Sequence, residues 1–147
     1  MSWITLDNKE IKSKEDLPNN CFGFVYRIDN LDSGKSYIGK KQCFSIYKKK
    51  FSKKKLLEIS DKRLKNYSIE KRETNWKKYT GSNTDLNLDI ALGNRIKKTI
   101  LEFAFSKRHL TYLELKYQII YGVLESEKWY NDSILGKFFR NIFEFKK

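Results

Sequence analysis

Residues 23–41 read "GFVYRIDNLDSGKSYIGKK", and this stretch decides the fold that the chain is expected to adopt. Two short apolar runs, at residues 22–28 and 36–40, flank the segment DNLDSGK, whose Asp, Asn, Ser and Gly residues are typical of turns. The pattern predicts two antiparallel strands joined by a glycine-containing loop. Each strand carries one tyrosine, Tyr26 or Tyr37, and taken alone this pair indicates aromatic packing between neighbouring strands.

The remaining segments predict one more strand, several helices and a short lead-in. Apolar residues at helical spacing favour the helices, and a glycine or a turn follows most of the segments. The predicted elements are a hairpin at residues 3–12, a basic helix or partly ordered arm at 45–67, helices at 84–91, 111–125 and 134–145, and a strand at 96–103. We therefore expect an α+β fold, with a small three-stranded antiparallel β-sheet flanked by helices and a basic helical arm.

The length of the chain predicts one domain. Its 147 residues provide enough material for a single hydrophobic core, and no internal repeat is visible. Within residues 1–147 we expect an N-terminal lead-in at 1–20, a core at 20–136, a basic arm at 45–78 and a C-terminal aromatic helix at 134–147.

Most of the positive charge lies in one segment. The formal net charge is +13 at pH 7, and residues 40–78 hold 15 Lys or Arg against 4 Asp or Glu, a net +11. Such a concentration points to nucleic acid as the partner, because lysines that neutralise phosphates release counterions. An anionic membrane surface is a weaker alternative because no lipid signal accompanies the charge. The third alternative is a solvated basic surface that has no specific partner.

Several function classes are disfavoured by composition. No run approaches the roughly 20 apolar residues of a membrane-spanning helix, and residues 1–18 contain no apolar block of secretory type. We therefore expect no membrane partner and a cytoplasmic location, in the host cell if the protein is viral. Cys21 and Cys43 are expected to be reduced, semi-buried thiols. With the single histidine, His109, they are too few for an all-protein zinc site.

Three further residues have ordinary structural explanations when each is taken alone. Lys40 fits a surface lysine, and Asn131 fits a turn residue in the sequence YND. Thr111-x-x-Glu114 matches a capping box, in which the glutamate bonds back to the amide of the cap residue. This pattern predicts that the helix begins at Thr111 and that Glu114 has a structural role.

Taken in order, these motifs resemble those of the GIY-YIG nuclease family. "FVY" at residues 24–26 stands where the family has GIY, and "YIG" at 37–39 is intact. A basic segment, a third strand, a helix with one glutamate and a late Tyr-Asn follow in the family's order. The chain is most similar to the freestanding Seg-type endonucleases of bacteriophages, because its lysine-rich stretch leads to "NWKKYTGSN" at 75–83. The resemblance covers about residues 20–136.

The resemblance implies a metal-dependent DNA endonuclease. It implies that Tyr26 and Tyr37 face the scissile phosphate and that one of them orients or deprotonates the attacking water. A phenol is a poor base unless positive charge stabilises the phenolate, and Lys40 matches the family lysine with that role. Glu114 matches the family's single metal ligand, which predicts Mg²⁺ or Mn²⁺ as the cofactor. Asn131 matches an asparagine that supports the site by hydrogen bonds.

Two positions depart from the family pattern. Phe24 replaces the glycine of GIY, which is a structural position. Tyr47 stands ten residues after Tyr37, where the family has an arginine that contacts the phosphate. Arg63, Arg72 or a lysine such as Lys48 is a candidate to replace it, although lysine lacks the bidentate fork of arginine. Loss of such a contact removes several kcal/mol of transition-state stabilisation.

Charge and resemblance together predict double-stranded DNA as the partner. Aromatic residues interleaved with the lysines of the basic segment fit core anchors or contacts to bases. The sequence leaves open whether the protein acts as a monomer or as a transient dimer. The predicted DNA-binding residues are Lys41, Lys48, Lys49, Lys50, Lys53, Lys54, Lys55 and Arg63.

Three function classes follow from the sequence. The first is a DNA endonuclease of phage homing or freestanding type. The second is a catalytically weakened nucleic-acid-binding protein on the same fold, which is favoured if nothing replaces the arginine missing at Tyr47. The third is an interaction protein that uses the aromatic residues 134–145 as a partner surface.

Overall fold

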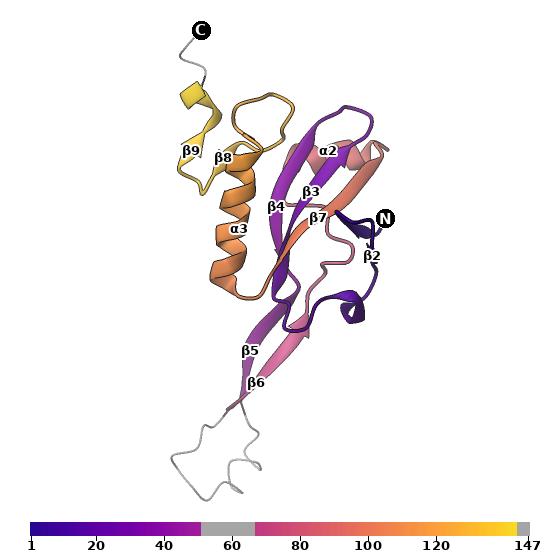
Figure 1. Ribbon diagram of the computed structural model, residues 1–147, viewed down its shortest axis with the longest axis vertical. Helices are drawn as coiled ribbons and strands as arrows, with labels where there is room; N and C mark the ends of the chain where they lie inside the picture. The colour runs from indigo at the N-terminus through magenta and orange to yellow at the C-terminus, as the bar shows by residue number, and fades with distance from the viewer. Residues whose placement is uncertain (51–66, 144–147) are drawn as a thin grey trace, which may run out of the picture.

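The computed structural model describes residues 1–50 and 67–143. Its main feature is a mixed five-stranded sheet with the strand order β2-β1-β7-β3-β4 (Figure 1). The antiparallel hairpin predicted from the opening stretch is confirmed as β3 and β4. The strands of this sheet are β1 (Trp3–Thr5), β2 (Glu10–Ile11), β3 (Gly23–Asn30), β4 (Ser36–Gln42) and β7 (Ile96–Ala104).

The predicted sheet of three antiparallel strands is wrong in its number of strands. Strands β7, β3 and β4 are the predicted three, and β3 pairs antiparallel with both of its neighbours. The N-terminal hairpin adds β2 and β1, and β1 runs parallel to β7. The reason lies in Trp3, which is fully buried. Its ring centroid lies 4.9 Å from that of Phe24, and its Nε1 donates to Trp76 O at 2.7 Å. This packing makes the lead-in part of the sheet.

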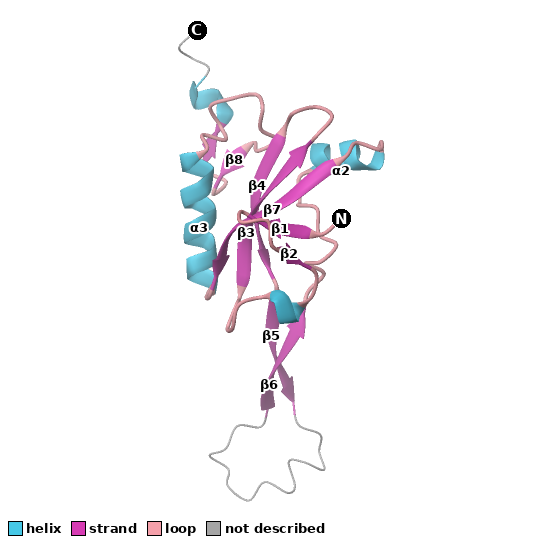
Figure 2. Cartoon of the chain, turned by 45° about the vertical axis from the view of Figure 1, so that its right-hand side comes forward, coloured by secondary structure: helices cyan, strands magenta, loops and turns pink. Residues whose placement is uncertain are grey.

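The two faces of the sheet carry separate hydrophobic clusters. Helix α3 (Lys107–Ile120) covers one face and packs on β3, β4 and β7 (Figures 1 and 2). The opposite face is covered by the segment that leads into α2 (Thr84–Ala91) and by Trp3, Trp76 and Leu86. Helix α2 agrees with the helix predicted at 84–91. A short 3-10 helix, η1 (Lys14–Asp16), lies in the N-terminal lead-in.

Helix α3 begins earlier than the capping-box pattern indicated. Ser106 is the N-cap, and its side chain accepts from the backbone N–H of His109 at 3.1 Å. Thr111 lies inside the helix, so the predicted capping box of Thr111 and Glu114 does not form. This frees the Glu114 carboxylate for other contacts. The helix stops before Gly122, whose φ of +60° favours glycine.

The described part of the basic arm is a strand pair and not a helix. Strands β5 (Phe44–Lys50) and β6 (Tyr67–Glu73) form an antiparallel ribbon that projects from the body at one end (Figures 1 and 2). The helix predicted at 45–67 is therefore wrong for residues 45–50, and residues 51–66 lie outside the described residues. The physical reason is the cross-strand pairing of Ile46 and Tyr47 with β6, which the local sequence of β5 does not reveal.

The described part of the C-terminal tail, residues 134–143, is also not the predicted helix, and residues 144–147 of that prediction lie outside the described residues. It forms a small strand pair, β8 (Ser133–Ile134) and β9 (Phe138–Phe139), followed by the 3-10 helix η2 (Arg140–Phe143). Leu135 and Gly136 both have positive φ, which turns the chain between the two strands. The tail aromatics stay about half exposed.

The two cysteines and the helices can be compared with what the sequence predicted. Cys21 and Cys43 are free thiols and are more fully buried than the sequence indicated. Among the described residues, no helix has the length and apolar character needed to cross a membrane.

Candidate active site at the edge of strand β4

Strand β4 forms an edge of the five-stranded sheet, so every second residue turns its backbone groups away from β3. Ser36 N donates to Lys128 O at 2.9 Å, and Tyr130 N donates to Ser36 O at 2.8 Å. At Ile38 the partner is the side chain of Asn131, which accepts from Ile38 N at 3.1 Å and donates to Ile38 O at 2.8 Å. Asn131 thus replaces a neighbouring strand at this position and is almost fully buried.

Glu114 occupies the next place along this edge. The backbone N–H of Lys40 donates to its carboxylate. One turn further along α3, Gln118 Nε2 donates to Ile38 O at 3.2 Å. Burial raises the pKa of Glu114, while the charge and the amide of Lys40 act in the opposite direction. Lys40 Nζ itself donates to Thr111 Oγ1 at 3.0 Å, so α3 and β4 hold one anion and one cation side by side.

The two tyrosines lie on the other face of the sheet and meet at Gly39. The ring centroids of Tyr26 and Tyr37 are 6.2 Å apart. A Cβ atom on Gly39 would lie 2.6 Å from Tyr26 Oη and 2.8 Å from Tyr37 Cε2, which is closer than real Cβ contacts. Glycine is therefore required here so that both rings can reach the β4 backbone. A β-bulge in the β3–β7 pairing, between Val25 and Tyr26, accompanies this arrangement.

Both phenols are held in their protonated form. Burial raises the pKa of Tyr26 well above its usual range, and the nearby Tyr37, Tyr79 and Glu114 raise it further. Burial also raises the pKa of Tyr37, against a hydrogen bond from Ser82 that lowers it. Without an added cation, both hydroxyls act near neutral pH as hydrogen-bond donors. This agrees with the expectation that a positive charge is needed before either one can act as a base.

The loop that contains the sequence NWKKYTGSN, residues 75–83, covers the tyrosine pair. Tyr79 lies with its ring centroid 6.1 Å from that of Tyr26, and Ser82 Oγ is 3.5 Å from Tyr37 Oη. Lys41 Nζ lies 4.2 Å above the Tyr79 ring, on the tyrosine side of the sheet. These contacts make Tyr79 and Ser82 part of the site. The signal that could have found them is the polar sequence Thr-Gly-Ser-Asn directly after Tyr79.

Buried side chains fix this loop to the sheet. Trp76 is fully buried, and its carbonyl oxygen accepts from Trp3 Nε1. Lys98 is only 2% exposed, with Nζ 4.2 Å from the Trp3 ring centroid and a hydrogen bond of 3.2 Å to Lys77 O. Burial lowers the pKa of Lys98 to about 8. Keeping Lys98 charged therefore costs free energy of folding. Its hydrogen bond to Lys77 O ties β7 to the loop that bears Tyr79.

The donor set fits a divalent cation held mainly by its substrate. The described residues contain no group of three His, Cys, Asp or Glu that could hold a metal. Glu114 is a single partly buried carboxylate, and one carboxylate with waters and phosphate oxygens is a usual set of Mg²⁺ ligands. Asp132 lies near enough for its charge to raise the pKa of Tyr37, which adds negative potential on the same side.

The structure brings together the five predicted catalytic residues, and of the predicted DNA-binding residues that it describes, three lie apart from them on β5. Tyr26, Tyr37, Lys40, Glu114 and Asn131 all converge on β4, although their catalytic roles remain predictions. Of the basic residues, Lys41 lies beside the loop over the tyrosines, and Lys48, Lys49 and Lys50 lie on β5. The others, Lys53, Lys54, Lys55 and Arg63, lie outside the described residues.

Tyr47, at the position of the family arginine, sits on the ribbon. Its hydroxyl donates to the carboxylate of Glu70, and Arg72 Cζ lies 4.1 Å from its ring centroid. Arg72 therefore packs on Tyr47 itself. Among the contacts of the described residues, it is Lys41 that lies beside the cluster formed by Tyr79 and the tyrosine pair.

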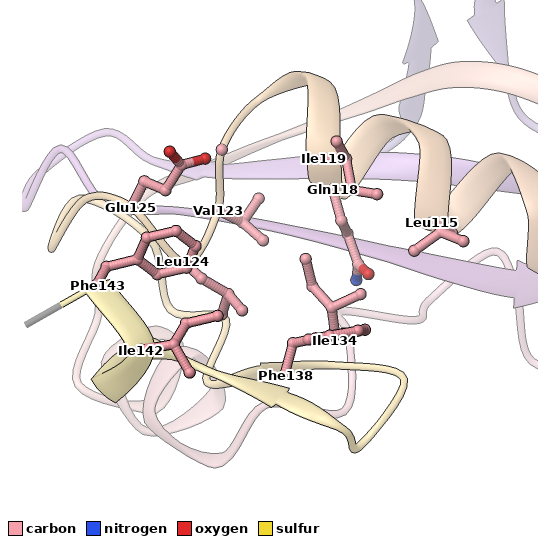
Figure 3. Close-up of a pocket in the computed structure, with 11 residues that line it drawn as sticks. Leu115, Gln118, Ile119, Val123, Leu124, Glu125, Ile134, Phe138, Ile142 and Phe143 are labelled. Carbon is pink, nitrogen blue, oxygen red and sulfur yellow. The ribbon is translucent and has the colours of Figure 1, made fainter.

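An apolar pocket of about 240 Å³ lies elsewhere, between the end of α3 and the C-terminal tail (Figure 3). Its walls include Val123, Ile134 and Phe138, and its polar lining is limited to Gln118 and Glu125. Gln118 already bonds to β4, so this pocket offers no set of catalytic groups. The chemistry of the described residues is concentrated at β4.

The chain was also compared with known proteins. A family model described as "Putative endonuclease segE, GIY-YIG domain" matches residues 3–134. The chain belongs to the GIY-YIG endonuclease family, and within it to the Seg type. No curated protein and no solved structure matches it. The family match includes Trp3 and the N-terminal hairpin, which the resemblance seen in the sequence did not cover.

Proposed function

We propose that this protein is a metal-dependent endonuclease that hydrolyses phosphodiester bonds of double-stranded DNA. The observation that carries the proposal is the convergence at one strand edge of the Glu114 carboxylate, the Lys40 ammonium group and the Tyr26–Tyr37 pair, in a chain of the GIY-YIG family. A single acid, a single base-stabilising cation and two phenols are a set suited to phosphoryl chemistry.

The protein's own groups would orient water and substrate. Tyr37, with Ser82 beside it, is the more exposed phenol and is suited to hold the attacking water. Tyr26 is buried and is suited to hold Tyr37 and the loop in place. Attack of the water on phosphorus breaks the bond to the 3′ oxygen, which leaves with a proton from solvent. The proton of the attacking water would pass to the Tyr37 oxygen, which must first have released its own proton to solvent and be in the phenolate form. The positive charge of Lys40 favours the phenolate form.

Glu114 would hold the cation. A bound Mg²⁺ or Mn²⁺ would supply charge stabilisation for the phosphate and for the leaving oxygen. Lys40 N–H and burial fix the position of the carboxylate, and Gln118 and Asn131 fix the strand to which it bonds. These contacts make the site rigid before substrate binds, which is the condition under which electrostatic stabilisation is strongest.

Lys41 is the best-placed replacement for the missing family arginine. It lies on the same side of β4 as the tyrosine pair and contacts the loop that covers it, whereas Arg72 is engaged with Tyr47. A lysine offers one point charge where arginine offers a bidentate fork, so we expect a slow nuclease. The alternative, a nucleic-acid-binding protein that has lost catalysis, is favoured by the same replacement and is separated from the nuclease by the test below.

The biological setting of the proposal is a bacteriophage nuclease of homing type acting in the cytoplasm of the host cell. The Seg-type family match supports this setting. The abundance of Lys, Asn and Ile in the sequence, as expected from an A·T-rich genome, also supports it. Whether the protein cuts one strand or both depends on whether it works as a monomer or as a transient dimer.

The test is cleavage of supercoiled plasmid in Mg²⁺ by the wild type, Glu114→Gln and Glu10→Gln. Glu114→Gln removes the metal-binding charge and keeps the size of the side chain, so we expect a loss of about 10³-fold or more in nicking rate. Glu10 lies exposed on β2, so Glu10→Gln is the matched control and should cut like the wild type. EDTA should abolish cutting in all three. DNA that is bound but uncut by wild type in both Mg²⁺ and Mn²⁺ would favour the binding protein.

A further inference from the structure

The β5–β6 ribbon stands apart from the rest of the sheet. Phe44 to Lys50 pair with Glu73 to Tyr67 in an unbroken antiparallel ladder, and these strands form a separate two-stranded sheet. Only Cys43 separates β5 from β4, the strand that carries the candidate active site. In both views the ribbon projects beyond the body (Figures 1 and 2). The projecting part of the ribbon is therefore available to a partner on both of its faces.

Alternation along the strands gives the ribbon two chemically different faces. Residues directly opposite each other in an antiparallel pair share a face, and neighbours along a strand alternate. We name the faces after Lys48 and Tyr47. The Lys48 face consists of Phe44, Ile46, Lys48, Lys50, Tyr67, Ile69, Lys71 and Glu73, and the Tyr47 face consists of Ser45, Tyr47, Lys49, Ser68, Glu70 and Arg72.

The cations of the Tyr47 face are occupied within that face. Lys49 Nζ lies 3.5 Å from a Glu70 carboxylate oxygen, and Tyr47 donates its hydroxyl to the same carboxylate. Arg72 stacks on the Tyr47 ring. This face therefore neutralises much of its own charge and presents a closed network.

The Lys48 face carries its charge outward. Its one acid, Glu73, lies at the base of the ribbon and accepts from Trp76 Nε1 at 2.9 Å and from Lys77 at 3.3 Å. Within the described residues no carboxylate pairs with Lys48 or Lys71. Their contacts are with rings: Lys48 Nζ lies 4.6 Å from the Tyr67 ring centroid, and Lys71 Nζ lies 4.1 Å from that of Phe44.

Two isoleucines on the same face are also exposed. Ile46 and Ile69 are 64% and 62% exposed, and each lies directly opposite a lysine across the ladder, Ile46 opposite Lys71 and Ile69 opposite Lys48. Exposed β-branched side chains beside these lysines gain nothing in water. They fit a partner that offers negative charge at its margins and apolar groups in its centre.

The major groove of duplex DNA offers this combination. It is about 12 Å wide and admits a two-stranded β-ribbon, its walls are phosphates, and its floor carries the methyl groups of thymine. The undistorted minor groove is only about 6 Å wide, so two strands about 4.8 Å apart that also bear side chains could enter it only if the DNA were widened and bent. The major groove of double-stranded RNA is too deep and narrow to be read in this way.

We infer that the Lys48 face of the ribbon enters the major groove of the DNA substrate. Ile46 and Ile69 then contact thymine methyl groups, and Lys48, Lys50 and Lys71 contact phosphates and guanine edges. This inference rests on the proposed function and deepens it by naming the surface that binds DNA beyond the site of cutting. From Tyr37 to Lys48 a continuous strand spans at most roughly 36 Å, at about 3.3 Å per residue. The bases contacted therefore lie within about one helical turn of the cut.

The test moves charge between the faces without changing it. The variant Ser45→Lys/Lys48→Ser/Ser68→Lys/Lys71→Ser has the composition and net charge of the wild type and places two lysines on the Tyr47 face. We expect its affinity for a 40-base-pair duplex, measured by fluorescence anisotropy in EDTA, to fall at least tenfold. Affinity within twofold of the wild type would show that total charge matters and the face does not, and it would overturn the inference. Circular dichroism checks that the variant is folded.

Two measurements on the same duplex keep the inference testable if that variant does not fold. Dimethyl sulfate methylates guanine N7 in the major groove and adenine N3 in the minor groove, and we expect wild type to protect guanine. Replacing thymine by uracil removes the methyl groups and should weaken wild-type binding several-fold while leaving the Ile46→Ser/Ile69→Ser variant unaffected. Protection of adenine alone, or equal sensitivity of both proteins to uracil, would overturn the groove assignment.

Failure of the inference can be told apart from failure of the proposed function. If wild type cuts plasmid in Mg²⁺ while the face exchange and the groove probes show no effect, the endonuclease stands and the ribbon inference falls. If wild type neither binds nor cuts DNA, both fall, because the ribbon inference depends on DNA being the substrate.

Discussion

At the scale of single residues, Gly39 is the tightest point of the candidate site. Tyr26 is 1% exposed and cannot move away from an added methyl group, which would meet its hydroxyl at 2.6 Å. The predicted residue Lys40 follows this glycine directly, and Tyr37 lies two residues before it on the same face of the strand. The intact YIG motif is therefore understandable as a steric requirement: the glycine allows two phenols to share one strand edge.

We predict that Gly39→Ala lowers the rate of plasmid cleavage at least tenfold and lowers the free energy of unfolding by about 1–3 kcal/mol, because it overpacks a buried contact. The matched control is Gly34→Ala in the β3–β4 turn. Gly34 has a φ of +78° and no atom within reach of a Cβ, so its substitution strains the backbone without touching the tyrosines. Similar cleavage rates for the two variants would contradict the steric explanation.

Lys98 provides a second prediction at this scale, on stability and pH. Its pKa of about 8 in the folded protein lies below the ordinary 10.5, so the unfolded chain binds the proton more tightly. Stability from this residue therefore rises with pH between about 8 and 10.5. Charged Lys98 costs up to about 3 kcal/mol at pH 7, and Lys98→Met removes this cost while losing the bond to Lys77 O.

We expect urea unfolding to show that the free-energy difference between Lys98→Met and wild type shrinks as the pH is raised from 7 to 9.5. Lys97, the exposed neighbour on β7, gives the control Lys97→Met, whose difference from wild type should stay constant. Parallel stability curves for Lys98→Met and wild type across this range would mean that Lys98 does not titrate in the folded protein.

Some residues of the candidate site could be predicted from the sequence, and others could not. The five predicted catalytic residues lie together at β4. They could be predicted because each belongs to a motif with a fixed order in the family. Ser82, Tyr79 and Thr111 were missed because their contacts join segments far apart in the chain. Ser82, for example, lies 45 residues from the tyrosine it contacts.

At the scale of elements, local pattern predicted the hairpin, α2 and β7 well. It did less well where tertiary pairing decides the conformation. Residues 45–50 carry lysines that suit a helix, yet cross-strand partners on β6 make them a strand. Thr111-x-x-Glu114 matched a capping box, but Ser106 caps the helix one turn earlier, and the turn formed by Ser106, Lys107 and Arg108 had no acidic partner to reveal it.

The partners at the edge of β4 illustrate a kind of contact that the sequence pattern could not predict. An edge strand must have its outward backbone groups satisfied or covered. Here Asn131, Gln118 and Glu114 supply side chains in place of a sixth strand. A side chain that takes the place of a strand leaves no periodic pattern in the sequence, because a single asparagine in a turn does not show which backbone groups it will contact.

At the scale of the whole molecule, charge and apolar surface lie at opposite ends. The ribbon projects at one end, and the tail with exposed Phe138 and Phe139 lies at the other (Figure 1). Ile134 is buried in the cluster between α3 and the sheet, whereas Phe138 and Phe139 stay 49% exposed. The interpretation of residues 134–145 as a partner surface therefore keeps its basis at these exposed rings and stays a prediction. The net charge of +13 acts over the molecule as a whole and drives encounter with DNA.

This separation leads to a prediction on salt. The described ribbon carries five cations, and about 0.9 counterions are released for each phosphate neutralised, so raising the salt from 50 to 200 mM should weaken DNA binding about 10²–10³-fold. The expected slope is the same for unrelated duplex sequences, because phosphates are common to all of them. A change of less than threefold over this range would show that the ribbon does not bind the DNA backbone.

The hydrogen bond from Ile38 N to Asn131 joins two parts of the candidate site that lie 93 positions apart in the chain. During synthesis on the ribosome, both tyrosines and Lys40 emerge long before Asn131 does. Until that residue has left the exit tunnel, the edge of β4 lacks its partner and the site is incomplete. We therefore expect a nascent chain of the proposed nuclease to cut DNA only after residue 131 has been synthesised and has joined β4.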